Sequence, residues 1–407
     1  MAIVALLSLL ASCRTLHVAW KRAPQSWSDI PLELAGLVLC RLPAHVDRVR
    51  FAAVCPQWRV AAREVPLSPP LPLLALPDGT VYSLPKSEPF SLPACAGYTD
   101  ACSNWLLFSQ EDGCFLRDPF SNATVTLTLP PLSQVRVRYV GDELGSGSTM
   151  SPNLIAASIW FQESSQIAVC QPGATSWWSM MHLDVHPIFC DLTFHQGKLY
   201  ALDHHQGDLF SVDTSIDHNT GDPWISQIWR VINGVFDQFI TATPSYGVLK
   251  MLYLAELHGR LLIVRRSMNR RFKASLTLEL AARSWMNEFE VFEGDFEQSQ
   301  WSRVTTIGDD QVLFLERGCC KFVCVSQYKM QGDRIFLLED GDDDDLENGD
   351  DDDLGNGDGD GSQYYEERLG PCKVFNIRDS KVSDPLPTVS WKHSPARATW
   401  LFPPGQE

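Results

Sequence analysis

The chain has 407 residues, of which 44% are hydrophobic and 20% are charged, as in a soluble globular protein with room for one small and one large domain. Its formal net charge is −17, but residues 339–360 hold thirteen acidic side chains and no Lys or Arg, which leaves only −4 on the remainder. The body of the protein therefore has no excess of basic residues. Because nucleic-acid binding needs a basic face, we expect no nucleic-acid partner.

Residues 1–12 are apolar and are followed by Cys13, an arrangement similar to a secretory signal. However, no Lys or Arg precedes the apolar run, where a signal peptide carries a basic segment. The run is also too short to span a bilayer, and no later segment has the length of a transmembrane helix. We interpret residues 1–26 as a poorly ordered N-terminal extension and expect no membrane partner, with a targeting signal as the alternative.

Residues 27–64 predict three short helices. Ser28 or Asp29 can cap the first, Pro31 suits its first turn, where a missing N–H costs nothing, and Pro56 opens the third. About forty residues cannot bury all their apolar side chains among themselves, so the surplus requires another surface, of this chain or of a partner. The apolar residues that recur at helical spacing are Ile30, Leu34, Leu37 and Val38 in the first helix and Val46, Val49, Ala53 and Val54 in the second.

Four patterns in this segment resemble an F-box in their order and spacing: Ile30-Pro31-x-Glu33-Leu34, Leu37-x-Leu39-x-x-Leu42-Pro43, Asp47-Arg48-Val49-Arg50 and Val54-Cys55-x-x-Trp58-Arg59. The resemblance implies docking onto the Skp adaptor of a cullin-based SCF ubiquitin ligase, and hence a protein of the cytoplasm or nucleus. The alternative is an ordinary helical cap packed on the larger domain. The partner-binding residues that the resemblance implies are Ile30, Pro31, Leu34, Leu42, Pro43, Val54, Cys55 and Trp58.

Residues 65–77 contain five prolines and predict a stiff linker. From there on, short apolar runs alternate with turns, and Asp78-Gly79 and Asp112-Gly113 are hairpin signals. We therefore predict a large all-β domain over residues 78–403. A β-propeller of six or seven blades is favoured, because blades use about 40–50 residues each and radial closure removes exposed sheet edges. A pair of β-sandwiches is the alternative. Further units of a Gly-containing turn and an apolar strand begin at Gly197, Gly259, Gly308 and Gly332.

Several short patterns in this domain resemble the plant KIB-type propeller domain. They are Leu76-Pro77-Asp78-Gly79-Thr80-Val81-Tyr82-Ser83-Leu84-Pro85, Leu116-Arg117-Asp118-Pro119-Phe120-Ser121, Asp191-Leu192-Thr193-Phe194-His195-Gln196-Gly197-Lys198-Leu199-Tyr200, Tyr328-Lys329-Met330-Gln331-Gly332-Asp333-Arg334-Ile335-Phe336 and Thr399-Trp400-Leu401-Phe402-Pro403. Together with the F-box, they imply a plant F-box protein whose propeller binds an unknown target protein for ubiquitination.

The acidic stretch at residues 339–361 is of low complexity, and we expect it to be disordered. Its flanks, Ile335–Leu338 and Cys372–Ile377, predict two strands of one hairpin, which makes the stretch a surface loop of a late blade. An acidic lure for a basic substrate and a Ca²⁺ site are functional alternatives, but the spacing does not match an EF-hand. We favour a solvated insertion.

No catalytic motif is present: the sequence has no Gly-x-Ser-x-Gly, no phosphate loop and no His-Glu-x-x-His. Its twelve cysteines include no Cys-x-x-Cys pair, which favours reduced thiols. His182-x-x-x-His186 and His204-His205 are read as surface or packing histidines, and the second pair as a hairpin turn. We therefore predict a non-catalytic receptor with no cofactor and no metal. The alternative is a propeller enzyme or glycan-binding module with the helices only as a cap.

Overall fold

The computed structural model describes residues 30–42, 44–65, 67, 69–84, 88–102, 105–110, 113–120, 126–130, 143–151, 154–161, 164–174, 176–179, 187–218, 221–234, 248–271, 284–316, 319–328, 330–338, 372–383 and 398–403. The chain divides into two compact units, residues 1–70 with 404–407 and residues 71–403. The N-terminal extension, Pro43, the pair His182 and His186, and the acidic stretch lie outside the described residues.

The first unit contains the three predicted helices, α2 (Leu32–Leu39), α3 (His45–Val54) and α4 (Pro56–Glu64). Pro31 precedes α2 rather than forming its first turn, because its ψ of 145° is extended. The expected caps Ser28 and Asp29 fall outside the described residues. Cys55 ends α3 in an extended conformation, and its Sγ accepts the Trp58 N–H at 3.4 Å, so the thiol caps α4.

The core of the helical unit is built around two aromatic rings. Phe51 of α3 and Trp58 of α4 stack with their centroids 4.4 Å apart. Gln57 Nε2 donates to the Ile30 carbonyl at 3.1 Å, which fastens the chain before α2 to α4. Residues buried with these rings are Ile30, Ala35, Leu39, Ala61 and Ala62.

The described residues of the second unit form strands and two short 3₁₀ helices (Pro93–Cys95 and Ser326–Tyr328). One sheet joins both ends of the unit in the order β25 (Thr399–Leu401), β1 (Leu73–Ala75), β2 (Thr80–Ser83) and β3 (Glu88–Ser91). The next two are β4 (Asp100–Cys102), β5 (Trp105–Gln110), β6 (Gly113–Arg117) and β7 (Thr126–Leu129), and then β11 (Trp178–Ser179), β10 (Ser164–Cys170), β9 (Leu154–Phe161) and β8 (Glu143–Ser151). The fourth is β12 (Phe189–His195), β13 (Lys198–Asp203), β14 (Leu209–Ile216) and β15 (Pro223–Ile232).

The remaining sheet has nine strands in the order β19 (Gln300–Val304), β18 (Ser284–Asp295), β17 (Arg260–Arg271), β16 (Val248–Leu257), β21 (Cys319–Cys324), β20 (Gln311–Glu316), β22 (Arg334–Leu337), β23 (Lys373–Asn376) and β24 (Lys381–Ser383). Its two halves meet at one parallel residue pair, Glu256 of β16 and Lys321 of β21. The sheet is therefore two blades that touch, β16–β19 and β20–β24.

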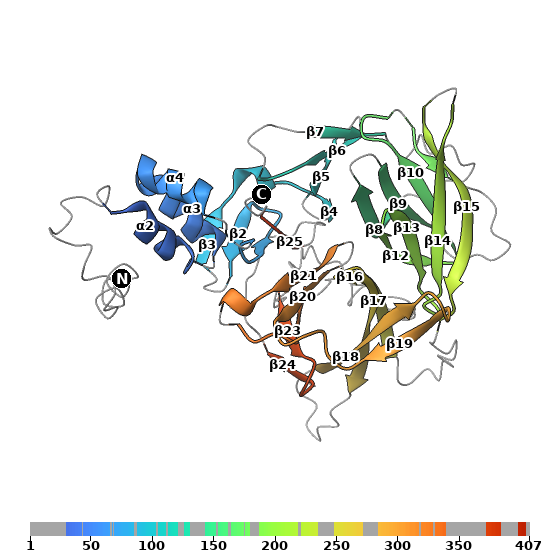
Figure 1. The fold of residues 1–407 in the computed structure, drawn as a ribbon. Helices are drawn as coiled ribbons and strands as arrows, with labels where there is room; N and C mark the ends of the chain where they lie inside the picture. The colour runs from blue at the N-terminus through green and yellow to red at the C-terminus, as the bar shows by residue number, and fades with distance from the viewer. Residues whose placement is uncertain are drawn as a thin grey trace, which may run out of the picture. The chain divides into compact units, whose positions relative to one another are not determined.

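Six buried clusters alternate with these six blades. Five of these clusters each combine side chains of two consecutive blades: the first and second, second and third, third and fourth, fourth and fifth, and fifth and sixth. The last cluster joins Phe314 and Phe336 of the sixth blade to Leu74 and Trp400 of the first, so the ring is closed. The unit is a β-propeller (Figure 1), and the strands that the structure describes make six blades. The alternative of two β-sandwiches is wrong, because each described sheet shares buried clusters with the blade before it and the blade after it, and not with a single partner sheet.

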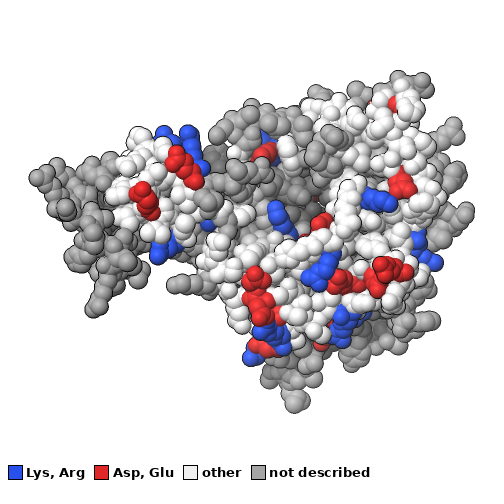
Figure 2. All heavy atoms as spheres, in the orientation of Figure 1, with Lys and Arg blue, Asp and Glu red and all other residues white. Residues whose placement is uncertain are grey.

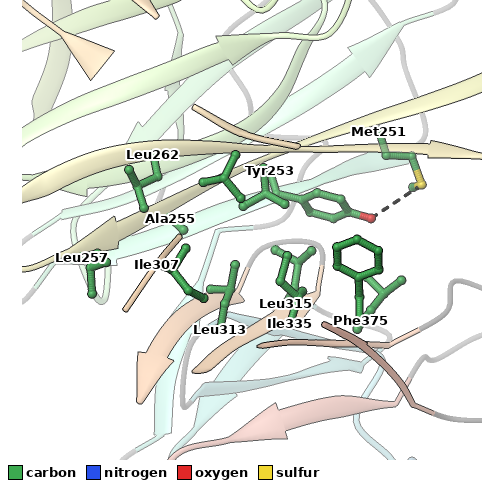
Figure 3. Close-up of a cluster of buried hydrophobic side chains, with 13 residues drawn as sticks. Met251, Tyr253, Ala255, Leu257, Leu262, Ile307, Leu313, Leu315, Ile335 and Phe375 are labelled. Carbon is green, nitrogen blue, oxygen red and sulfur yellow. Dashed lines mark hydrogen bonds between the residues drawn. The ribbon is translucent and has the colours of Figure 1, made fainter. Parts of the chain in front are cut away.

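Figure 3 shows the cluster between the fifth and sixth blades, where β16 and β17 face β20, β22 and β23. Within this otherwise apolar cluster, Tyr253 keeps its hydroxyl paired by donating to Met251 Sδ at 3.6 Å. Successive side chains of β16 point alternately into the cluster shared with the fourth blade and the cluster shared with the sixth. Because both faces of the strand are buried, its sequence is a nearly continuous apolar run.

A buried carboxylate holds the C-terminal strand in place. Glu316, at the end of β20, is 6% exposed; its Oε1 accepts the Thr399 hydroxyl at 2.5 Å and its Oε2 accepts the Trp400 N–H at 2.6 Å. Both donors belong to β25, which pairs with β1 at the other end of the domain. The three-residue strand β25 thus closes the ring by pairing with β1 and by donating two hydrogen bonds to the carboxylate of Glu316.

The turn signal at Asp78-Gly79 is confirmed, whereas Asp112 lies outside the described residues. β1 and β2 form an antiparallel hairpin across Asp78-Gly79, where Gly79 has φ +85° and Asp78 Oδ1 accepts the Thr80 N–H at 2.8 Å. The flanks of the acidic stretch also pair as expected, since β22 and β23 are antiparallel neighbours from Arg334↔Asn376 to Leu337↔Lys373.

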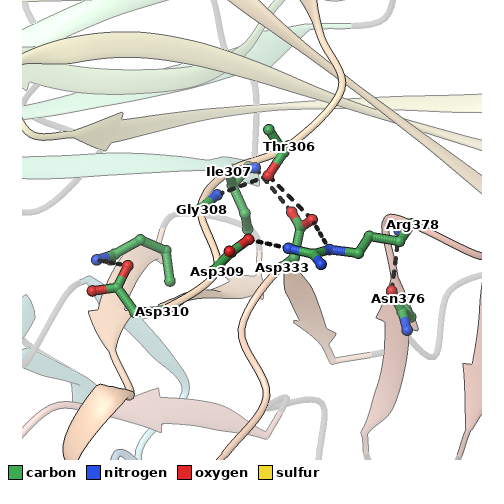
Figure 4. A network of polar contacts seen from close by, with 9 residues as sticks. Thr306, Ile307, Gly308, Asp309, Asp310, Asp333, Asn376 and Arg378 are labelled. Atoms are coloured by element: carbon green, nitrogen blue, oxygen red, sulfur yellow. Dashed lines mark hydrogen bonds and ion pairs between the residues drawn. The ribbon is translucent and has the colours of Figure 1, made fainter.

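A polar network holds the sixth blade together beside this hairpin (Figure 4). Asp333 is 1% exposed with φ +60°, and its carboxylate accepts the Ile307 N–H at 2.9 Å and the Thr306 hydroxyl at 3.1 Å. Arg378 donates Nε to the same carboxylate at 2.7 Å and also bonds Asp309. These hydrogen bonds raise the pKa of Arg378, so the guanidinium stays charged.

We expect substitutions of Asp333 and Arg378, the two charged partners in this network, to lower the free energy of unfolding by different amounts. Asp333→Ala leaves buried donors unpaired and should lower the free energy of unfolding by about 2–4 kcal/mol. Arg378→Ala removes a half-exposed partner that water can replace, and should lower the free energy of unfolding less than Asp333→Ala does. Urea unfolding followed by circular dichroism measures both. Equal losses for the two variants would contradict this account.

The nine cysteines whose side chains the structure describes are free thiols, as the sequence indicated. Burial raises the pKa of Cys95 and Cys170 to about 12, whereas Cys40 and Cys324 are exposed. We expect Ellman's reagent at about pH 8 to modify Cys40 and Cys324 in the folded protein and to leave Cys95 and Cys170 unmodified until unfolding. Mass spectrometry of the peptides identifies the modified residues, and early modification of Cys95 would contradict the prediction.

The thiols of Cys95 and Cys170 also predict how the free energy of unfolding changes with pH. Their folded pKa lies above the unfolded value of about 8.5, so the neutral thiols contribute stability below that pH. This contribution is lost as the pH rises from about 8.5 towards the folded value of about 12.

Candidate partner-binding site on the helical unit

The helical unit exposes apolar side chains on all three helices. Leu37 of α2 is 44% exposed, Val49 and Val54 of α3 are 52% and 49% exposed, and Val60 of α4 is 42% exposed. Only nine large hydrophobic residues of the described chain are this exposed, and four of them lie in this small unit. Exposed apolar side chains are therefore more concentrated in the helical unit than in the propeller.

The exposed residues do not form one stripe. Val49 and Val54 are five positions apart on α3, so at 3.6 residues per turn they point about 140° away from each other. A rigid partner that covers one of them therefore leaves the other at the edge of the interface or outside it. This separation provides a matched pair of positions for testing which side of α3 binds.

The predicted site residues divide into two layers. Ile30 and Trp58 are both 8% exposed and belong to the core. Pro31 and Val54 are exposed, and Pro43 lies outside the described residues. The half-buried members, which pack against the core from the outside, are Leu34, Leu42 and Cys55.

The sequence predicted the three helices correctly but not which side of the second helix is buried. It assigned Val46, Val49, Ala53 and Val54 as the apolar positions of the second helix, but the last three are exposed and Phe51 is the buried residue of α3. The reason is the stacking of Phe51 on Trp58, which rotates the aromatic side of α3 towards α4. Phe51 is the largest apolar side chain of the helix, and that signal could have identified it.

Arginines support the ends of the helices. Arg48 Nε donates to the Leu42 carbonyl at 2.9 Å, and a guanidinium N–H of Arg41 donates to the Leu37 carbonyl at 2.6 Å. Burial lowers the pKa of His45, and the charge of Arg48 lowers it further, so the ring is held neutral beside these cations. These arginine hydrogen bonds satisfy carbonyl groups at the ends of short helices and so stabilise them.

The propeller offers no metal centre within the described residues, where no group of three His, Cys, Asp or Glu side chains converges. His204 and His205 lie in the turn between β13 and β14, as expected, and Asp203 Oδ2 accepts the His205 N–H at 3.0 Å. His195 is 3% exposed and its Nδ1 lies 3.2 Å from the Glu256 carboxylate. Figure 2 shows acidic and basic residues interspersed over the visible face of the described surface.

Comparison with protein families identifies the large unit. The model of the KIB1-4 beta-propeller family matches residues 73–365. This chain belongs to that family. The matched range lies within the propeller and contains none of the three helices, so the KIB-type match leaves the helical unit unassigned. No curated protein matches the chain.

Solved structures match the chain only with low sequence identity and low TM-scores. Hydrazine synthase of Kuenenia stuttgartiensis matches with 13% identity and a TM-score of 0.31, over 68% of this chain and 78% of that chain. The xyloglucan-locus GH43B protein of Bacteroides ovatus matches with 9% identity and a TM-score of 0.26, over 60% of this chain and 42% of that one, less than half its length. At these scores neither likeness carries an argument about the KIB-type chain.

None of the helices in the described part of the chain is long and apolar enough to cross a membrane.

Proposed function

We propose that this chain is the substrate-recognition subunit of an SCF ubiquitin ligase, as the F-box resemblance implies. The observation that carries the proposal is the exposed apolar surface of the helical unit, where Val54 is 49% exposed over a core that contains Ile30 and Trp58. The Skp adaptor would cover that surface and so bury apolar area that the unit cannot bury by itself. The proposal includes the plant origin, the cullin contacted through the adaptor, and a location in the cytoplasm or nucleus.

In this role the KIB-type propeller holds a target protein and the chain does no chemistry. Tethering raises the local concentration of the target's lysines near the charged ubiquitin carrier, and linked binding modules gain their effect in this way without new contacts. The proposal therefore assigns no catalytic residue, no cofactor and no metal. A propeller enzyme or glycan-binding module has no specific observation in its favour.

The test is capture of the purified full chain by the purified Skp adaptor, measured by titration calorimetry. We expect Val54→Asp to weaken binding at least tenfold, because it replaces a buried apolar contact with an unpaired carboxylate. Val49→Asp, equally exposed on the opposite side of α3, serves as the matched control and should change the affinity by less than about threefold.

Both variants must retain the helical circular dichroism signal of the parent. Adaptor binding that is lost with Val54→Asp and kept with Val49→Asp supports docking through the predicted face. A parent chain that is well folded and does not bind the adaptor would overturn the proposed function.

A further inference from the structure

Exposed aromatic side chains gather at one place on the propeller, on the fourth blade. Trp224 and Trp229 of β15 are 43% and 46% exposed, and Phe296, in the turn between β18 and β19 of the fifth blade, is 40% exposed. No other aromatic residue of the described chain is as exposed as these three. Exposed Trp is rare in a surface that binds nothing and is enriched at binding hot spots.

The pairing of the strands puts these residues on the same side of the blade. Tyr200 of β13 lies opposite Ser211 of β14, and Ser211 lies opposite Trp229 of β15. Residues directly opposite each other in a sheet share a face, and Tyr200 in turn contacts Phe296, with ring centroids 5.6 Å apart. The small Ser211 therefore separates two aromatic side chains, and its buried hydroxyl has no hydrogen-bond partner.

The same face continues along the hairpin to the second tryptophan. Asp213 lies opposite Gln227, and Ser215 lies opposite Trp224. A bulge at Ser226 adds one residue to β15, which brings Trp224 and Trp229 to the same side although they are five positions apart. We call the set Tyr200, Ser211, Asp213, Trp224, Trp229 and Phe296 the aromatic face.

The opposite side of the hairpin is occupied over its inner part, whereas Ile216 at the end of β14 is 51% exposed. Phe210, Val212 and Ile225 are buried in the cluster shared with the third blade. On the side of the aromatic face, the fifth blade covers the inner part, where Leu202, Leu209 and Tyr200, which is 8% exposed, are buried against β16 and β17. After Val212, Asp213 and Ser215 of β14 are half-buried on the side of the aromatic face, and Thr214 and Ile216 are exposed on the other side.

The charge of the hairpin is negative. Residues 209–232 contain Asp213, Asp217 and Asp222 and a single cation, Arg230, which is ion-paired with Asp208 at 3.0 Å. The negative charge of Asp213 contributes, after burial, to the raised pKa of Tyr200, which places the carboxylate close to the aromatic ring. A carboxylate among exposed indoles favours an Arg or Lys side chain, through an ion pair and cation–π contacts.

The geometry of the strand favours a peptide. β15 is an edge strand, and within the described residues no strand pairs with its outer side (Figure 1). Along β14, the positions opposite the two tryptophans are Ser211 and Ser215, four residues apart, or about 13 Å at 3.3–3.4 Å per residue. This spacing equals that of side chains one and five of an extended peptide. Asp213 lies midway on β14, one strand in from β15 and opposite Gln227, so only a long side chain at position three, such as Arg or Lys, reaches it.

We propose that the aromatic face binds an extended basic segment of a partner protein, added alongside β15, with apolar side chains at positions one and five on the tryptophans and Arg or Lys at position three on Asp213. Addition of a strand to a sheet edge is a general mode of peptide recognition. The inference rests on the proposed function only in identifying this partner as the ligase substrate; the binding site itself stands on the propeller alone.

The test uses the full chain and a fluorescein-labelled peptide that contains Leu-Ser-Arg-Ser-Leu, with Leu-Ser-Glu-Ser-Leu as the charge control, followed by fluorescence anisotropy. We expect the Arg peptide to bind at least tenfold more tightly than the Glu peptide. Trp224→Ala with Trp229→Ala should weaken binding at least tenfold, and Asp213→Asn should remove most of the preference for Arg. Val382→Ala, which truncates an exposed valine of β24, should have no effect.

Each result decides the proposal. Equal binding of both peptides, binding that the tryptophan variant retains, or no binding at all would overturn it. Binding of cellohexaose in place of the peptide, lost in the same variant, would overturn the peptide assignment and show a glycan site. Capture of the Skp adaptor by the tryptophan variant is measured in parallel and should be unchanged, so a failure of this site is distinguishable from a failure of the proposed ligase role.

Discussion

Replacing Trp400 with alanine should lower the free energy of unfolding of the propeller by about 3–5 kcal/mol. Trp400 is fully buried, and its ring packs edge-on against Phe314, with centroids 4.9 Å apart. It lies at the middle of β25, the strand that closes the ring, so the cavity would form between the first and sixth blades. Urea denaturation followed by far-ultraviolet circular dichroism measures the loss.

A second variant separates packing from hydrogen bonding at this position. The indole Nε1 of Trp400 is buried without a hydrogen-bond partner, so Trp400→Phe removes an unpaired donor while it keeps most of the ring. We expect this variant to lose clearly less stability than Trp400→Ala. If Trp400→Ala were as stable as the parent chain within about 0.5 kcal/mol, closure through β25 would not contribute to the fold as described.

Replacing Trp58 with alanine should unfold the helical unit and leave the propeller folded. Trp58 is 8% exposed, stacks on Phe51 and donates its backbone N–H to the Cys55 thiol that caps α4. Loss of a buried tryptophan costs about 3–5 kcal/mol, which is comparable to the whole stability of so small a core. The expected result is loss of the helical signal at 222 nm together with adaptor binding.

Trp58→Phe is the control, since a phenyl ring can still stack on Phe51 and should retain most of the helical signal. The urea midpoint of the propeller should be the same in both variants, because the two units are compact by themselves. A Trp58→Ala variant with full helical signal would contradict the assigned core.

Local chemistry explains which parts of the fold are predictable from the sequence. Gly79 and Gly197 have φ of +85° and +77°, a conformation that glycine adopts without strain, and both mark hairpins in the sequence. The flanks of the acidic stretch are predictable for a similar reason, because two apolar runs beside an insertion usually pair. Pro31 and Pro56, at the starts of α2 and α4, mark two of the three helices in the sequence.

Features that depend on distant residues were not predictable. The Glu316 carboxylate meets Thr399 and Trp400 across more than eighty positions of the chain, and no local pattern marks that contact. The number of blades is set by which sheets share a buried cluster. The sequence alone was compatible with six or seven blades. β20 also pairs in parallel with β22, an arrangement that a simple succession of hairpins does not suggest.

For the candidate site, the sequence predicted the segment but not the exposure of each residue. Val54 is on the surface and Trp58 is beneath it, although both are apolar members of one short pattern. The bulge in β15 that aligns Trp224 with Trp229 is equally invisible in the sequence, where five-residue spacing places them on opposite faces of a regular strand.

The most direct test of the central claim is amide hydrogen–deuterium exchange of the full chain with and without the Skp adaptor. The account predicts slower exchange within residues 31–60 in the complex, including the peptide that carries Val54, and unchanged exchange over the strands of the propeller. Protection confined to the propeller, or no protection with a well-folded chain at saturating adaptor, would contradict it.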